Sequence, residues 1–250
     1  MVKLKTAKEL NMMQLAGKVS ARALKLAGAA VEPGVSTKEI DEIAFKYIKS
    51  QGAIPSFLGY NGFPSSCCIS INNEVIHGIP NSNRIIKNGD IVSIDVGACL
   101  NGFHGDNAWT FACGDISSEA QSLLDATKES LFEAIKISKP GNRLGDIGNA
   151  VEEYVKTRGY SVVRDFVGHG IGTQLHEEPS VPNYGRSGHG LRLLPGMTIA
   201  IEPMVNMGSS TVKTLDDNWT VITSDGTLSA HFEHTIAITS DGPLILTNSD

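Results

Sequence analysis

An internal repeat at a spacing of 107 residues is the feature that most restricts how this 250-residue chain can fold. The segments EPGVSTKEIDEIAFKYIKSQG at 32–52 and KPGNRLGDIGNAVEEYVKTRG at 139–159 share six identical residues at that spacing. In both, apolar residues recur at the 3.6-residue period of an amphipathic helix, and both end at a glycine. One domain built from two similar halves, about 1–112 and 113–250, is therefore expected.

The same spacing relates two apolar strand segments, each of which carries an acid. Asp95 in NGDIVSIDVG lies 107 residues before Glu202 in PGMTIAIEPM. A second pair of acids, Asp106 in GDNAWTF and Glu233 in FEHTIAI, follows in the same order, although the loop lengths differ. Each half is therefore expected to contain two helices followed by strands.

Helix-start signals and turns complete the expected architecture. Thr6 and Ser36 each stand three residues before a glutamate, and Ser118 stands three residues before a glutamine, so each is expected to open a helix. Short strand segments separated by glycine turns favour antiparallel pairing. The expected fold class is α+β, with two helix-helix-strand units around a pseudo-twofold axis forming a curved, mostly antiparallel sheet with helices on one face.

Composition and charge exclude several classes of protein. With 41% hydrophobic residues the chain can bury a full core, so disorder is not expected. The net charge of -6 and the lack of a basic run argue against nucleic acid or an anionic membrane as the main partner. No stretch approaches the roughly 18 apolar residues of a membrane span, and the start lacks the apolar core of a signal peptide. A cytoplasmic location is expected.

The cysteines match neither a CxxC metal clip nor the disulfide framework of a secreted protein. They are expected to be reduced and packed as small apolar residues. They are Cys67, Cys68, Cys99 and Cys113.

The four acids of the repeat raise an electrostatic problem. If the halves meet across a twofold axis, Asp95 faces Glu202 and Asp106 faces Glu233. Four carboxylates cannot all stay ionised in a partly buried place, because like charges and desolvation raise each pKa. A divalent metal resolves the conflict, and oxygen ligands with histidine suit Mn, Fe(II), Co or Zn. The alternative is that these acids are ordinary solvent-exposed hairpin residues.

Three histidines accompany the acids in glycine- or proline-containing turns. His169, in VGHGIG, is flanked by glycines that permit close approach of a metal or ligand, although GHGIG is not the dinucleotide-binding fingerprint. His77 and His176 each lie in a His-x-x-Pro turn and are expected to flank the cleft that holds the four acids between the two halves. The other histidines read as surface or strand-packing residues, and among them only His231 is close enough to Glu233 to support a ligand.

Six motifs in this order resemble type I methionine aminopeptidases of the pita-bread fold, over nearly the whole chain: EVIHGIP, SIDVGACLNGFHGD, VGHGIG, HEEPSVPNYG, IAIEPMV and HFEHTIAI. The resemblance implies a hydrolase that removes the N-terminal methionine from nascent proteins and peptides when the second residue is small. The implied reaction is attack of a metal-bridging hydroxide on the first peptide bond. Two divalent metal ions, Co, Mn, Fe(II), Zn or Ni, are implied, with these ligands: Asp95, Asp106, His169, Glu202 and Glu233.

The resemblance also implies roles at the substrate. His77, His176 and Glu202 are expected to be catalytic, with Glu202 carrying a proton to the leaving amine. The expected partners are peptide and nascent-chain N-termini that begin with Met, and ribosome docking and a monomeric state are further expectations. The implied substrate-binding residues are His77, Phe57, Tyr60, Phe63, Cys68, Leu175, His176 and Trp219.

Three other interpretations stay open at this level. A peptidase of the same scaffold that cleaves X-Pro bonds, in the manner of prolidase or aminopeptidase P, usually carries an additional N-terminal domain, for which this chain has no residues to spare. A non-catalytic binding module is expected to lose ligand residues, whereas all five candidates are present. A structural protein with an acidic cleft is expected to show no metal-dependent activity.

Overall fold

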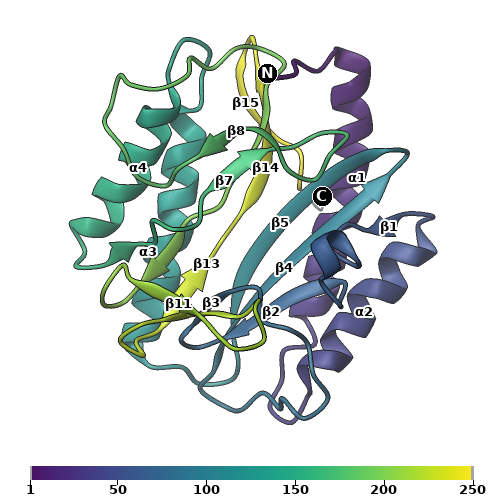
Figure 1. Ribbon diagram of the computed structural model, residues 1–250, viewed down its shortest axis with the longest axis vertical. Helices are drawn as coiled ribbons and strands as arrows, with labels where there is room; N and C mark the ends of the chain where they lie inside the picture. The colour runs from purple at the N-terminus through teal and green to yellow at the C-terminus, as the bar shows by residue number, and fades with distance from the viewer. Residues whose placement is uncertain (1, 249–250) are drawn as a thin grey trace.

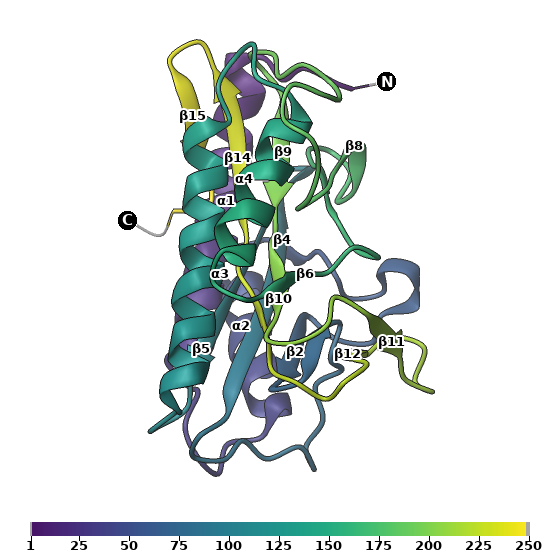
Figure 2. The ribbon, with the colours of Figure 1, turned by 90° about the vertical axis from the view of Figure 1, so that its left-hand side faces the viewer.

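The computed structural model describes residues 2–248, and its helices lie on one side of its strands (Figures 1 and 2). Every pair of strands is antiparallel. The predicted α+β class, with an antiparallel sheet and helices on one face, is confirmed. The helices are α1 (Ala7–Gly28), α2 (Thr37–Ser50), α3 (Ser118–Ile137) and α4 (Leu144–Lys156).

The first half of the chain is built around one long hairpin. Strands β4 (Ile91–Leu100) and β5 (Phe103–Ala112) pair along their whole length, so that Asp95 lies opposite Ala108 and Asp106 lies opposite Gly97. The other side of β4 pairs with two shorter strands. The remaining elements of this half are β1 (Ile54–Pro55), the 3-10 turn η1 (Tyr60–Gly62), β2 (Cys67–Ile71) and β3 (Glu74–Ile76).

The second half is built from shorter strands, and its central pair is not consecutive in the chain. Strand β9 (Thr198–Ile201) pairs with β14 (His234–Thr239), and Glu202 follows directly after β9. On its other side β9 pairs with β7 (Gly168–Gly170). The remaining strands are β6 (Ser161–Val162), β8 (Glu177–Val181), β10 (Met204–Asn206), β11 (Val212–Thr214), β12 (Val221–Thr223), β13 (Ser229–His231) and β15 (Gly242–Ile245).

The two halves meet where β5 runs beside the segment between β13 and β14. The backbone N–H of Glu233 donates to the carbonyl of Ala108 at 2.8 Å. The hydroxyl of Thr235 accepts from the backbone N–H of Asp106 at 3.1 Å and donates to its carbonyl at 2.8 Å. These bonds hold Asp106 and Glu233 side by side, although they come from different halves.

A glycine contact brings α1 directly against the site-bearing strand. A Cβ atom at Gly105 would lie 2.5 Å from the Cα of Gly17, so the two backbones pack together without side chains between them. Asp106, the next residue on β5, thus lies where this strand packs closely against α1. The division of the chain near residue 112 stays a prediction, although β5 ends at Ala112 and α3 begins at Ser118.

Two of the three predicted helix starts are confirmed. Thr6 and Ser36 both exchange hydrogen bonds with the glutamate three residues on. The third is wrong, because the cap of α3 is Ser117, whose hydroxyl accepts from the N–H of Ala120 at 3.1 Å. Adjacent serines give the same local signal, and the helix begins one residue earlier than expected. Among residues 2–248, no helix has the length and apolar content needed to cross a membrane.

Candidate active site

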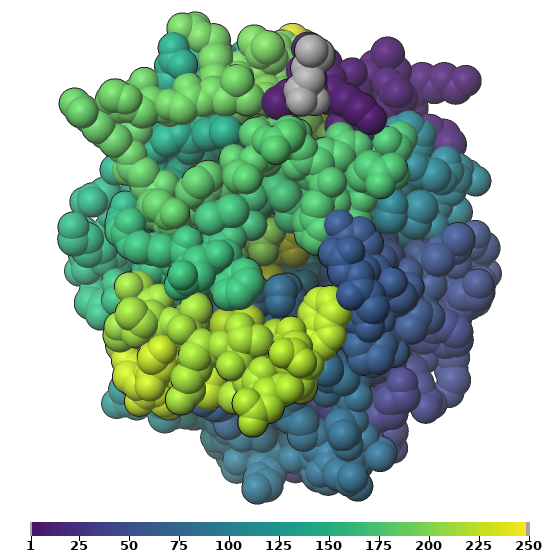
Figure 3. Space-filling model, in the orientation of Figure 1, coloured from purple at the N-terminus to yellow at the C-terminus, as the bar shows by residue number. Residues whose placement is uncertain are grey.

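A hollow opens in the centre of the face opposite the helices (Figure 3). It leads into a cavity of about 170 Å³ between the two halves. Every site residue predicted from the sequence lines it, together with Asn61, which the sequence did not indicate. The predicted residues are Phe57, Tyr60, Phe63, Cys68, His77, Asp95, Asp106, His169, Leu175, His176, Glu202, Trp219 and Glu233.

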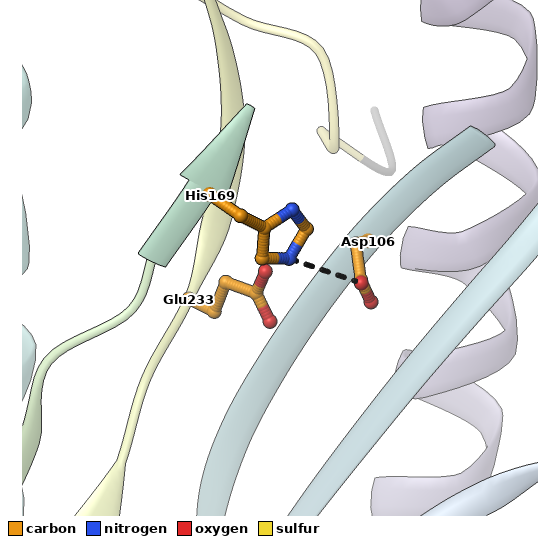
Figure 4. A group of neighbouring side chains, drawn as sticks. All are labelled: Asp106, His169 and Glu233. Atoms are coloured by element: carbon orange, nitrogen blue, oxygen red, sulfur yellow. Dashed lines mark ion pairs between the residues drawn. The ribbon is translucent and has the colours of Figure 1, made fainter. Parts of the chain in front are cut away.

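Three ligand-type side chains that line this cavity point toward one another (Figure 4). Asp106 comes from β5, His169 from β7, and Glu233 from the break between β13 and β14. One ligand atom from each lies within 4.8 Å of the other two. The Nε2 atom of His169 is also 3.7 Å from Oε1 of Glu202. Three of the four expected acids, Asp106, Glu202 and Glu233, therefore lie around one imidazole.

The imidazole of His169 is held in one tautomer. Its Nδ1 lies 2.8 Å from the carbonyl oxygen of Gly170, which can only accept, so Nδ1 carries the proton. Burial lowers the pKa of His169 to about 3, so the ring is neutral near pH 7. Its Nε2 lone pair is therefore directed at the acids, in the form that binds a metal.

The carboxylates strongly disfavour each other's ionisation. Burial raises the pKa of Asp106 to about 7. Burial, and then the charge of Asp106, raise the pKa values of Asp95, Glu202 and Glu233 well above their ordinary range. In the absence of a cation, this cluster holds protons that isolated carboxylates would release at neutral pH.

Unpaired oxygen atoms show that the cluster fits a metal. Oδ1 of Asp95, Oδ1 of Asp106 and Oε1 of Glu233 are buried and have no hydrogen-bond partner among the described residues. A buried acceptor without a partner is costly, and a cation would satisfy all three. Carboxylate oxygens with one imidazole nitrogen and no thiolate suit a divalent ion such as Mn, Fe(II), Co or Zn.

His77 and His176 flank the cavity, and both are neutral near pH 7. Burial lowers the pKa of His77 to about 4 and also lowers that of His176. His77 adopts a φ of 59°, which is uncommon for a residue other than glycine. Its ring meets Phe166 and Trp219 edge-on, at centroid distances of 5.8 and 6.3 Å. The Nδ1 of His176 lies 2.8 Å from the Tyr60 hydroxyl.

Apolar side chains form the part of the cavity beside the acids. The rings of Phe63 and Trp219 meet edge to face, with centroids 5.1 Å apart. Burial, and then the charge of Asp95, raise the pKa of the Cys68 thiol, so it stays neutral and acts as a small apolar group. Phe57 and Leu175 are buried in the same cluster. An apolar pocket thus opens directly beside the candidate metal ligands.

His231 lies nearer to a different acid than the sequence indicated. Strand alternation placed it beside Glu233, whereas its Nε2 lies 3.7 Å from Oε2 of Glu202. That nitrogen is buried and has no hydrogen-bond partner among the described residues. Asn183, which the sequence did not single out, donates its amide to the carbonyl of Glu202 at 2.8 Å. Both contacts join segments far apart in the chain, so no local pattern could have indicated them.

Comparison with known proteins places this site in a family. The profile of metallopeptidase family M24 matches residues 11–240. Methionine aminopeptidase 1 of Bacillus subtilis is 55% identical over 247 residues, which cover 99% of each chain. The methionine aminopeptidase of Clostridium perfringens is 56% identical over the same length and coverage.

Solved structures agree with the sequence comparison. The crystal structure of methionine aminopeptidase from Thermotoga maritima superimposes with a TM-score of 0.98 at 44% identity, covering 99% of this chain and 100% of that one. The prolidase of Pyrococcus horikoshii shares the fold, with a TM-score of 0.79 at 22% identity over 99% of this chain and 64% of that one. The chain therefore belongs to metallopeptidase family M24 and, within it, to the methionine aminopeptidases.

Proposed function

We propose that this methionine aminopeptidase removes the N-terminal methionine from peptides and nascent proteins whose second residue is small. The observation that carries the proposal is the convergence of Asp95, Asp106, His169, Glu202 and Glu233 beside an apolar pocket, with three of their oxygens unpaired. Five donors of this kind are more than one ion needs when each carboxylate can bridge. Two divalent ions are therefore proposed, and these five residues would hold them.

The ions and the protein contribute different parts of the chemistry. When bound, the ions supply Lewis acidity at the first peptide carbonyl and lower the pKa of a water molecule. The side chain of Glu202 lines the cavity and is only partly buried, so it can reach both water and substrate. We assign to a carboxylate oxygen of Glu202 the transfer of a proton to the leaving amine.

His77 and His176 are proposed to contact the substrate. Because both rings are neutral, each can donate one N–H without placing a positive charge beside the metal ions. If the Tyr60 hydroxyl donates to Nδ1 of His176, the proton of that ring lies on Nε2. We propose that this N–H stabilises the developing oxyanion of the first peptide bond and that His77 binds the substrate backbone.

The apolar side of the cavity is proposed to bind the methionine side chain. Phe63, Trp219 and Cys68 offer edge-on aromatic and thiol contacts that suit a flexible thioether. At about 170 Å³ the cavity has room for one side chain of that size. Met-Ala peptides are expected to be cleaved much faster than Met-Trp peptides.

Hydrolysis of Met-Ala-Ser and of Ala-Pro, measured side by side, tests the proposal. The enzyme is expected to cleave the first, to lose activity after dialysis against chelator, and to regain it with Mn, Co or Fe(II). Cleavage of Ala-Pro alone would favour an X-Pro peptidase, with which the fold is shared. Activity that survives rigorous removal of divalent ions would exclude the metal-dependent mechanism.

Replacement of Glu202 tests the proton-transfer role. Glu202→Ala is expected to lower kcat by at least about a hundredfold, the usual scale of general acid-base catalysis, while the protein stays folded. Glu153→Ala, at an exposed glutamate on α4, is the matched control. Full turnover in the Glu202 variant would remove the assigned role.

A cytoplasmic location, ribosome docking and a monomeric state stay predictions.

A further inference from the structure

The turn between β7 and β8 carries two residues of the cavity wall, Leu175 and His176, and is closed by a buried ion pair. The ammonium of Lys5, in the segment before α1, lies 2.5 Å from Oε2 of Glu177. These two side chains are 6% and 7% exposed, although 172 residues separate them in the sequence. Neither residue has a part in the proposed chemistry.

Glu177 links Lys5 to the backbone of this turn. Its other oxygen, Oε1, accepts from the backbone N–H of Gln174 at 3.2 Å and from the hydroxyl of Thr173 at 3.4 Å. Although burial raises the pKa of Glu177, the hydrogen bond from Lys5 and that from Gln174 bring it below its ordinary value. The carboxylate is therefore charged near pH 7 and holds Lys5 and the turn together.

Lys5 itself is fixed at its backbone. Its N–H donates to the carbonyl of Gly196 at 2.7 Å, and the next residue, Thr6, caps α1. The Lys5 side chain thus extends to the turn from a backbone that is hydrogen-bonded to Gly196 and continues into α1. A buried pair of this kind is destabilised strongly when one partner is removed, because the other charge is left without compensation.

The last glycine of the VGHGIG motif provides the space for this pair. A Cβ atom at Gly172 would lie 2.5 Å from Cε and 2.8 Å from Nζ of Lys5, and 2.7 Å from Oε1 of Glu177. Gly172 does not adopt a positive φ, so its backbone conformation does not require glycine. A Cβ atom here would meet the ends of the Lys5 and Glu177 side chains, so the ion pair would have to shift to make room for it.

We propose that Lys5 is a positioning residue for the active site, which acts through Glu177 to hold Leu175 and His176 against the cavity. The proposal rests on the proposed role of His176 in catalysis. Removal of the ammonium frees the turn, so the His176 ring no longer keeps its place beside Tyr60 and His169, whose centroids lie 5.2 and 4.2 Å from it. The segment before α1 thereby supports the position of His176 without contacting the substrate.

The first test is a double-mutant cycle in the metal-loaded enzyme. Lys5→Met is expected to lower kcat on Met-Ala-Ser roughly tenfold with a smaller change in KM, and to cause no further loss in a His176→Ala background. Lys8→Met, an exposed lysine-to-methionine change on α1, is the control and should leave kcat unchanged. An equal loss in both backgrounds, or a change in Tm without a change in kcat, would overturn the proposal.

Hydrogen exchange gives a second measurement that does not depend on activity. Backbone amides of residues 172–177 are expected to exchange about tenfold faster in Lys5→Met and in Gly172→Ala than in the wild type or Lys8→Met. Unchanged protection of this turn would overturn the proposal even if kcat fell. If the wild type cleaves Ala-Pro in place of Met-Ala-Ser, the proposed function fails, and the same cycle on Ala-Pro still tests Lys5.

Discussion

The Nδ1 atom of His176 and the hydroxyl oxygen of Tyr60 lie 2.8 Å apart and join opposite walls of the cavity. Tyr60 stands in the η1 turn of the first half, whereas His176 stands between β7 and β8 of the second. The Tyr60 hydroxyl therefore orients the imidazole, and when this hydroxyl donates to Nδ1, the ring proton lies on Nε2 and faces a substrate.

Tyr60→Phe removes this orientation and leaves the ring of residue 60 in place. A hydrogen bond of this kind contributes about 1 kcal/mol, so kcat on Met-Ala-Ser is expected to fall roughly fivefold to tenfold. Tm should change little, since Tyr60 is only partly buried. Steady-state kinetics with Tyr47→Phe, a tyrosine on α2, as the control would check this. An unchanged kcat would show that Tyr60 does not orient His176.

The acid cluster predicts how the stability of the metal-free protein depends on pH. Acids whose pKa is raised in the folded state bind more protons than in the unfolded state, so the free energy of unfolding falls as pH rises. Buried histidines such as His169, with a lowered pKa of about 3, act in the opposite direction, but only below about pH 6.5. The acids therefore dominate between about pH 6.5 and 8.

Urea unfolding across that pH range, with and without Mn, would measure the effect. The metal-free protein is expected to lose up to about 1.4 kcal/mol per pH unit for each acid that titrates there, and saturating Mn should remove the loss. Asp106→Asn should flatten the slope of the metal-free protein near pH 7, where Asp106 itself titrates. Stability that rises with pH would contradict the raised pKa values.

The acids could be predicted from the sequence because two of them, Asp95 and Glu202, lie in segments that are otherwise largely apolar and correspond in the repeat. A carboxylate in a strand such as β4 is unfavourable unless a cation or a hydrogen-bond donor compensates for its charge. Asp95 and Glu202 are separated by the 107 residues of the repeat, which indicated that they occupy corresponding positions in the two halves. The order of Asp106 and Glu233 then sufficed to predict that the four acids would converge. Asp106 and Glu233 are buried and Asp95 and Glu202 are at most partly exposed, which excludes the alternative of solvent-exposed hairpin acids.

The contacts that hold the histidines could not be predicted in this way. Lys5 lies in a segment that reads as an ordinary charged start, and its partner Glu177 follows His176 without any period that marks it. Tyr60 was expected only as a pocket residue, and its bond to His176 depends on how two loops meet. Side-chain pairs between distant loops leave no local pattern, because neither periodicity nor capping determines them.

His231 is expected to tune metal binding through Glu202. Its Nε2, which lies 3.7 Å from Oε2 of that acid, has no other partner among the described residues, so the ring can orient the carboxylate. His231→Leu should weaken Mn affinity about tenfold, and His231→Gln, which keeps a donor, should weaken it less. Calorimetric titration of the metal-free variants would measure this. Equal affinities in all three proteins would show that His231 only fills space.

Trp219 is expected to set the preference for methionine, because its ring closes the pocket against Phe63 at a centroid distance of 5.1 Å. Trp219→Ala removes that wall, so kcat/KM for Met-Ala-Ser should fall by about ten- to a hundredfold, the range expected for lost apolar contacts. Peptides that begin with Phe should lose less or gain. Leu215→Ala, at an exposed position just after β11, is the control, and a panel of Met, Leu and Phe peptides is the measurement. If every peptide slowed by the same factor, Trp219 would support the fold of the site and not its selectivity.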